Sequence, residues 1–216
     1  MKKIGVFDSG VGGRSVANAI QKALPDYEVI FVDDSKHLPY GSKAPEEIFG
    51  YVKPILDGLV KDGCEIIIIA CNTVTTTLID RLRSEFKIPL VGIEPMVKPA
   101  AELTKTGVIA VCATPTTLAS QRYAWLKDNY AKHVKVLEPD CSDWTYMIQN
   151  NQVDHQKIAG RINEVLDAKA DVIVLGCTHY HWIEDEIKEI AGDRAAVLQP
   201  EKPVIEQLKR ALTQLS

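Results

Sequence analysis

Two cysteines of this chain follow apolar runs at the points where buried strands are expected to end. Cys71 comes after IIIIA and is followed by Asn72 and Thr73, and Cys177 comes after VIVLG and is followed by Thr178 and His179. A helix is expected to start after each cysteine, and the partial positive charge of its first N–H groups should lower the pKa of the thiol. Such a thiol can serve as a base or a nucleophile. The alternative for any strand cysteine is plain packing in the core, which is our interpretation of Cys64, Cys112 and Cys141.

The two cysteines occupy equivalent positions in an internal repeat. They are 106 residues apart, and aligning KIGVFDS with GVIAVCAT pairs Ser9 with Thr114 at a separation of 105 residues. Because the two separations agree within one residue, the chain reads as two related halves with a boundary near Glu94 and Pro95. We expect a first domain over residues 1–95 plus 204–216 and a second over residues 96–203.

Short β-branched runs alternate with longer stretches of helical period, which is typical of α/β proteins with mainly parallel sheets. The clearest helix spans residues 45–61, with an apolar stripe at Ile48, Val52, Ile55 and Leu59. The last helix is expected over residues 203–215, with a stripe at Val204, Leu208, Ala211 and Leu215. The predicted strands cover residues 3–7, 28–32, 65–70, 89–93, 108–112, 134–137, 171–175 and 196–198.

Polar residues at the strand ends define the expected site. Ligands of open α/β sheets bind outside the carboxyl ends of the strands. If the two halves are related by a pseudo-twofold axis, four polar strand ends meet in one cleft between them. Asp8 would then lie beside one cysteine and His179 beside the other as polar partners.

The segment DSGVGG, from Asp8 to Gly13, is a glycine-rich turn between a strand and a helix, and its N–H groups could hold a carboxylate or a phosphate. A dinucleotide fingerprint is one alternative, with Asp33 or Asp34 as the acid that binds ribose. The glycine spacing and the acid at Asp8 disfavour that alternative. A purely structural turn is the other.

Further candidates at strand ends have structural alternatives as well. Pro39, Tyr40 and Gly41 could form an ordinary turn, and Thr114, Thr116 and Thr117 could simply cap a helix. Their position nevertheless favours contact with a substrate. The pair His179 and His181 could suggest a metal site, but no acid or cysteine follows at the spacing of metal ligands, so we expect no metal.

Composition excludes several classes of protein. The 216 residues carry 29 acidic and 25 basic side chains without a basic stripe, so a nucleic-acid partner is not expected. No apolar stretch approaches the roughly 20 residues of a membrane helix, and the start of the chain does not resemble a signal peptide. We therefore expect no membrane partner, a cytoplasmic location and five free thiols.

Two thiols on opposite walls of a cleft suit racemisation by two bases. One cysteine removes the α-proton of an amino acid as a thiolate, and the other delivers a proton from the opposite face as a thiol. No lysine site of the kind that binds pyridoxal phosphate can be picked out, so we expect no cofactor. The carbanion would then be stabilised by N–H groups and by threonine or asparagine side chains at the helix starts.

The stretches IGVFDSGVGG, LPYGSK, ACNT, VGIEP and LGCTHY resemble, in order and spacing, the cofactor-independent glutamate racemases of the aspartate/glutamate racemase superfamily. The resemblance implies interconversion of L- and D-glutamate, a supply of D-glutamate for peptidoglycan, a cytoplasmic location and a homodimer. It implies Cys71 and Cys177 as the catalytic acid/base residues, assisted by Asp8 and His179. The substrate-binding residues it implies are Asp8, Ser9, Tyr40, Gly41, Asn72, Thr73, Thr178 and His179.

The chain also departs from the family pattern. Gln149 stands where the family usually has a glutamate, His181 stands in place of a proline, and Arg14 stands in place of a leucine. Both cysteines are present. The alternatives are a racemase or epimerase for another amino acid, or a weakly active member that binds an amino acid or a protein partner.

Overall fold

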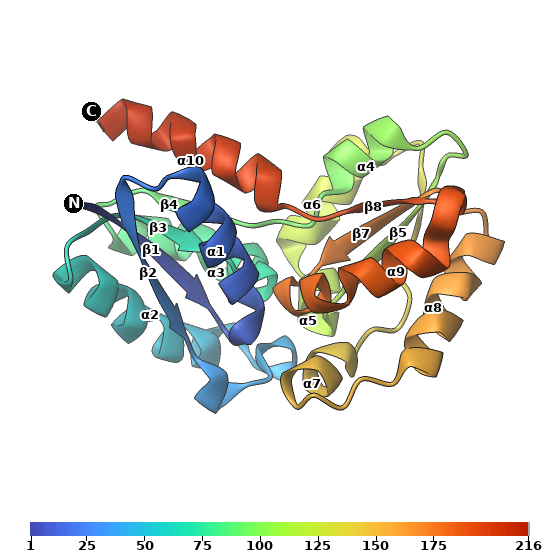
Figure 1. The fold of residues 1–216 in the computed structure, drawn as a ribbon, viewed down its shortest axis with the longest axis horizontal. Helices are drawn as coiled ribbons and strands as arrows, with labels where there is room; N and C mark the ends of the chain where they lie inside the picture. Colours follow the sequence, from blue (N-terminus) through green and yellow to red (C-terminus); the bar gives the residue numbers. More distant parts are fainter. Residues whose placement is uncertain (216) are drawn as a thin grey trace. The chain divides into compact units, whose positions relative to one another are not determined.

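The structure is a computed structural model that describes residues 1–215 (Figure 1). Its internal contacts divide the chain into two compact units. Unit 1 contains Met1–Glu94 together with the chain from Pro200 onward, and unit 2 contains Pro95–Gln199. Relative to the ranges expected from the sequence, Pro95 lies in unit 2 and residues 200–203 lie in unit 1.

Unit 1 is built on a sheet of four parallel strands in the order β2-β1-β3-β4. The strands β1 and β3, which carry Asp8 and precede Cys71, lie side by side in the centre. The strands are β1 (Lys2–Asp8), β2 (Tyr27–Asp33), β3 (Cys64–Ile69) and β4 (Leu90–Gly92), and the helices are α1 (Arg14–Ala23), α2 (Pro45–Lys61), α3 (Asn72–Glu85) and α10 (Glu201–Leu215).

Helices cover both faces of this sheet, which explains the run of four isoleucines. Ile66 and Ile68 pack against α1 and α10, whereas Ile67 and Ile69 pack against α2 and α3. Side chains alternate between the faces of a strand, so a strand buried on both sides is apolar throughout. Figure 1 shows α1 and α10 of unit 1.

Unit 2 repeats this plan with the strand order β6-β5-β7-β8, again parallel. The order is that of unit 1 with every strand number raised by four, so β3 and β7 are equivalent. The predicted α/β fold with two parallel sheets is confirmed, and all eight predicted strands are present. The strands are β5 (Val108–Ala113), β6 (Lys135–Leu137), β7 (Val172–Gly176) and β8 (Ala196–Leu198), and the helices are α4 (Val97–Leu103), α5 (Pro115–Leu118), α6 (Gln121–Tyr130), α7 (Trp144–Gln149), α8 (His155–Asp167) and α9 (Glu184–Ala191).

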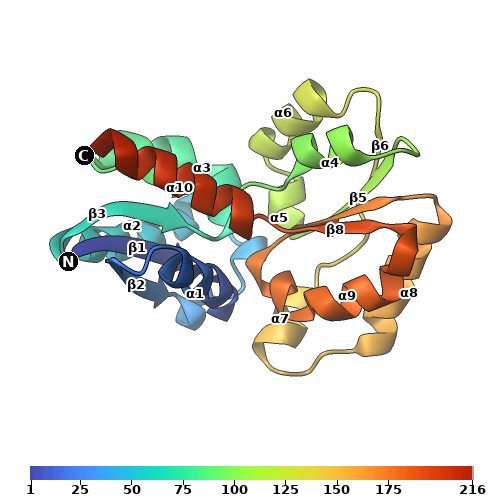
Figure 2. The ribbon, with the colours of Figure 1, turned by 45° about the horizontal axis from the view of Figure 1, so that its top comes forward.

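The sheet of unit 2 is also buried on both faces. Ile109 and Val111 pack with α4 and α6, whereas Ile173 and Leu175 pack with α7, α8 and α9. Figure 2 shows α4 and α6 on one side of β5 and β8, and α8 and α9 on the other. Each sheet therefore presents its strand ends, rather than a face, to potential ligands.

The predicted stripes of two helices need correction. In α2, Leu56 is fully buried and Ile55 only partly, and in α10, Leu212 is buried whereas Leu215 is 42% exposed. Residues three and four positions further along a helix lie near the same face, so the apolar spacing alone does not predict which of them is buried. The helix α10 also begins at Glu201, two residues before the expected start at Pro203, because proline is tolerated in the first turn.

No helix within residues 1–215 combines the length and the apolar character that crossing a membrane requires. All five cysteines are free and buried.

Candidate functional site

Cys71 lies at the N-cap of α3, directly beyond the end of β3. The N–H of Ala70 donates to the carbonyl of Phe7 over 2.8 Å, which ties the end of β3 to β1. This register brings the first residues beyond the two strands together, and Ser9 Oγ lies 3.3 Å from Cys71 Sγ. The expected helix start after Cys71 is confirmed.

The pKa of Cys71 corrects the expectation from the sequence. Burial and the nearby Asp8 carboxylate raise the pKa of this thiol to about 11. The Ser9 hydroxyl and the backbone N–H groups of Val74 and Thr73 lower the pKa, as expected at a helix start, but they do not offset the two larger effects. In the protein without ligand, Cys71 is therefore a thiol at neutral pH.

This shift makes stability depend on pH. The pKa of Cys71 rises from 9.0 to about 11 on folding, so the unfolded chain loses its proton first. The stabilising effect is complete below about pH 9 and is lost as the pH rises to about 11, at about 1.4 kcal/mol per pH unit. In urea unfolding at about pH 8 and about pH 11, we expect the wild type to lose about 2 to 3 kcal/mol more than Cys71→Ser. An equal loss in the two proteins would contradict the shift.

Asp8 is the last residue of β1, directly before the glycine-rich turn. Its Oδ1 accepts the N–H of Gly10 over 2.9 Å, and the side chain is fully buried. A Cβ added at Gly13 would lie 2.4 Å from Asp8 Cβ, so the turn needs glycine there to make room for the acid. The Asp8 carboxylate accepts an N–H of the turn that a phosphate would otherwise bind. The turn is therefore better suited to holding Asp8 beside Cys71 than to binding a dinucleotide.

Tyr40 reaches toward the same strand ends from the segment after β2. It is almost fully buried, and its hydroxyl donates to Asp34 Oδ2 over 2.6 Å. Burial and the Asp34 carboxylate raise the pKa of Tyr40, and Cys71 and Asp8 are near enough to raise the pKa further. Asp34 also bonds the ring of His37 at 2.8 Å. The Pro39–Tyr40–Gly41 segment is therefore held beside Cys71. Asp34 fixes this segment because it accepts from Tyr40 and contacts His37.

Asn72 has an unusual environment. Its side chain is 3% exposed, yet neither Oδ1 nor Nδ2 has a hydrogen-bond partner among residues 1–215. A buried amide without partners costs free energy, so such groups often mark a place where a ligand binds. Thr73, the next residue, is also buried, and its carbonyl accepts the hydroxyl of Thr77.

Cys177 follows β7 as Cys71 follows β3. Gly176 allows the close approach of β7 to β5, because an added Cβ would lie 3.0 Å from Ala113 Cβ. Here the structure differs from the expected α-helix start: a 3-10 helix, Thr178–Ile183, follows Cys177 and continues into α9. Cys177 and Thr178 are both buried, with Cys177 8% exposed.

The polar groups around Cys177 differ from those around Cys71. Thr145 Oγ1 lies 3.7 Å from Cys177 Sγ, and His179 Nδ1 lies 3.9 Å from the same sulfur. The other ring nitrogen of His179, Nε2, lies 2.8 Å from Gln149 Oε1. The structure thus brings His179 to Cys177, as the sequence suggested, and adds a glutamine on the far side of the ring.

Of the three candidate threonines after β5, Thr114 caps the short helix that contains the other two. Thr114 Oγ1 accepts the N–H of Thr117 at 3.3 Å and donates to Thr117 Oγ1 at 3.0 Å. Thr116 lies in the same short helix, α5. By strand register, Ala113 pairs with Gly176, so Thr114 still stands next to Cys177 in the sheet, where Ser9 stands next to Cys71 in unit 1.

Two residues with a place in these clusters were not expected. Thr145 belongs to no motif, and only the packing of α7 brings it to Cys177. The sequence offered Asp34 only as an acid for ribose, and no pattern in it indicates the bond to Tyr40, which depends on how the segment after β2 folds.

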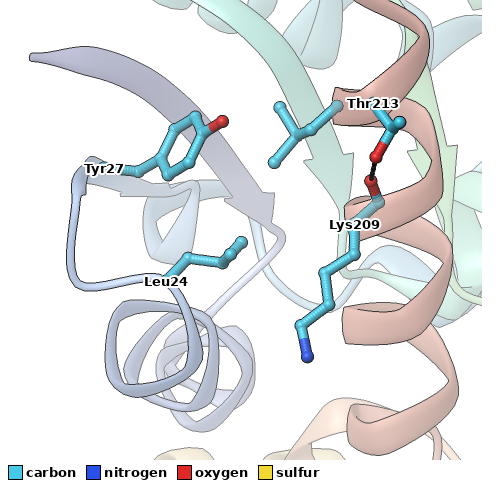
Figure 3. Close-up of a pocket in the computed structure, with 5 residues that line it drawn as sticks. Leu24, Tyr27, Lys209 and Thr213 are labelled. Atoms are coloured by element: carbon cyan, nitrogen blue, oxygen red, sulfur yellow. Dashed lines mark hydrogen bonds between the residues drawn. The ribbon is translucent and has the colours of Figure 1, made fainter.

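A pocket of unit 1 lies away from these residues. It is formed where the end of α1 and the start of β2 meet α10 (Figure 3). Tyr27 begins β2, so this pocket is at the opposite end of the strands from Asp8 and Cys71. Its lining contains Leu24, Tyr27, Lys209, Leu212 and Thr213. Within residues 1–215, no group of three or more His, Cys, Asp or Glu side chains is arranged to hold a metal.

Comparison with known proteins places these features in a family. The family model described as Asp/Glu/Hydantoin racemase matches residues 13–214. A glutamate racemase of Ralstonia pickettii is 38% identical over 213 residues, which cover 97% of this chain and 76% of the relative.

Solved structures agree with that match. The crystal structure of Escherichia coli glutamate racemase in complex with L-glutamate and the activator UDP-MurNAc-Ala has a TM-score of 0.88 and 26% identity, over 98% of this chain and 82% of that one. The crystal structure of glutamate racemase from Francisella tularensis in complex with D-glutamate has a TM-score of 0.81 and 26% identity, over 99% of this chain and 81% of that one.

Proposed function

Because the chain belongs to the Asp/Glu/hydantoin racemase family, we propose that it is a glutamate racemase that moves the α-proton of glutamate with two cysteines. The observation that carries the proposal is the equivalence of Cys71 and Cys177. Each follows the same strand of a repeated sheet, caps a helix, and has an acid/base group and a hydroxyl nearby. Racemisation requires such a pair, because the proton must leave one face of the carbon and return to the other.

The proposed reaction uses one thiolate and one thiol at a time. The thiolate takes the α-proton and becomes a thiol, while the other thiol donates its proton to the opposite face of the carbanion and becomes a thiolate. The roles are exchanged for the other enantiomer. Cys71 starts with a raised pKa, so it needs help to become a base. The α-ammonium group of a bound amino acid supplies a positive charge that favours the thiolate.

The polar groups of each unit bind the substrate in this proposal. The buried amide of Asn72 can both accept from an ammonium group and donate to a carboxylate. The N–H groups at the start of α3 stabilise negative charge that develops on the carboxylate of the carbanion. We propose that other residues also bind the substrate. These are Ser9, Thr73, the Pro39–Tyr40–Gly41 segment, Thr178 and the threonines Thr114, Thr116 and Thr117.

The test is incubation with L-glutamate in deuterated water. We expect the circular dichroism signal to decay to zero while deuterium enters at Cα, because the delivered proton comes from a thiol that exchanges with solvent. L-Aspartate and L-alanine, run in parallel, test the substrate. Exchange with aspartate or alanine but not with glutamate would show that the substrate is another amino acid, and the absence of exchange with any acidic amino acid would contradict glutamate racemase activity.

The resemblance of the sequence extends the proposal to the fate of the product. D-Glutamate made in this way would supply peptidoglycan synthesis, with the protein in the cytoplasm. We include a homodimer in the proposal on the same ground.

A further inference from the structure

Gln149, the last residue of α7, contacts His179, and what we infer from this contact rests on the function proposed above. His179 is 1% exposed and lies between two groups, the Cys177 sulfur at 3.9 Å from Nδ1 and the Gln149 oxygen at 2.8 Å from Nε2. The two contacts use different ring nitrogens. The group that holds the proton on one ring nitrogen therefore determines whether the other nitrogen carries a hydrogen or a lone pair.

An amide oxygen can only accept a hydrogen bond, so the contact at 2.8 Å requires the hydrogen of the ring on Nε2. In a neutral imidazole with hydrogen on Nε2, Nδ1 carries a lone pair. That lone pair is directed to the side of the ring where Cys177 lies. This tautomer can accept the proton of a thiol, whereas the opposite tautomer would present an N–H and could not.

We propose that Gln149 is a positioning residue that holds His179 in the tautomer protonated at Nε2, so that Nδ1 accepts the proton of the Cys177 thiol. The thiol S–H bond breaks, an N–H bond forms at Nδ1, and the result is a thiolate beside an imidazolium. The proton returns by the reverse step when Cys177 acts as an acid, so no other reactant is needed.

The lack of charge on Gln149 has a consequence of its own. A carboxylate at this position would also accept from Nε2, but its charge would stabilise the imidazolium and raise the pKa of His179. The neutral amide sets the tautomer without adding that charge. Cys177 can therefore recover its proton from His179 more readily than it could beside a carboxylate.

The experiment compares Gln149→Leu and Gln149→Glu with the wild type. Leucine has a similar size but no acceptor, and glutamate keeps the acceptor and adds charge. Gln152, an exposed residue just beyond α7, provides matched controls in Gln152→Leu and Gln152→Glu. The tautomer of His179 is read from nitrogen chemical shifts of protein labelled in its five histidines, with His179→Gln used to assign the signal.

We expect the wild type to show hydrogen on Nε2 of His179. In Gln149→Leu we expect a mixture of tautomers and a roughly ten-fold lower kcat with KM within about two-fold. Gln149→Glu should keep the tautomer and retain most of kcat, while the limb of the pH profile that reports His179 moves to higher pH. The two variants of Gln152 should match the wild type.

Hydrogen on Nδ1 in the wild type would overturn the proposal, and so would a Gln149→Leu protein with the wild-type tautomer and pH profile. The spectroscopic result does not require turnover. If no amino acid is racemised, the proposed function fails and the state of the His179 ring still tests Gln149. If racemisation is found with the wrong tautomer, only the inference about Gln149 fails.

Discussion

Replacing Cys71 or Cys177 by serine is expected to abolish racemisation in both directions, lowering kcat by roughly a thousand-fold or more. A serine hydroxyl is far less acidic than a thiol, so it neither removes the α-proton nor delivers one at a useful rate. Both cysteines must act in every turnover of a two-base reaction. Racemisation is followed by circular dichroism starting from each enantiomer.

Deuterium exchange gives the same pair of variants a sharper signature. A protein with one working thiol can still remove the proton of one enantiomer and return deuterium to the same face. We expect Cys71→Ser to exchange one enantiomer slowly and Cys177→Ser the other, with neither variant inverting the carbon. Cys64→Ser is the matched control, because Cys64 is buried at the opposite end of β3. A variant at Cys71 or Cys177 that kept wild-type turnover would show that the reaction does not use two cysteines.

Replacing Asn72 by leucine is expected to stabilise the free protein while it damages function. The amide of Asn72 is buried without a partner, and removing such a group gains about 1 to 2 kcal/mol of stability. The substrate would lose two hydrogen bonds, so kcat/KM for glutamate should fall about 100-fold, equivalent to about 2.7 kcal/mol. Urea unfolding and initial rates measure the two effects in one preparation.

A second asparagine tests whether replacement of asparagine by leucine stabilises the protein wherever it is made. Asn150 follows α7, and its Nδ2 donates to the carbonyl of Tyr146 over 2.8 Å. We expect Asn150→Leu to leave activity unchanged and to give no gain in stability. A loss of stability in Asn72→Leu would show that the amide stabilises the fold and is not reserved for a ligand.

The fold was predictable from the sequence because its signals are local and repeated. Strands buried on both faces need continuous apolar runs, and IIIIA and VIVLG are such runs at equivalent positions. The spacing of 106 residues between the two cysteines indicated two halves of the same plan, and the strand orders of the two sheets agree with that plan. The buried faces of the helices were predicted less accurately, as Leu56 and Leu212 show. Residues three and four positions apart lie near the same face, and only packing determines which of them is buried.

Within the candidate site, the sequence identified the groups that come directly after strands. Parallel neighbours place Ser9 beside Cys71 through backbone register alone, and His179 lies two residues from Cys177. The sequence did not identify the residues that other elements contribute to the site. Thr145 reaches Cys177 from α7, and no pattern in the sequence indicates which residues of that helix turn inward.

By itself, the sequence determined the family, the two parallel sheets and the pair of cysteines, because those depend on residue types and spacing along the chain. Only the tertiary structure decided the chemical state of the groups around them. Burial and the Asp8 carboxylate raise the pKa of Cys71 against the pull of the helix start, since desolvation depends on everything packed around the sulfur. In the same way, Gln149 became the partner of His179 only when α7 was folded against the segment after β7.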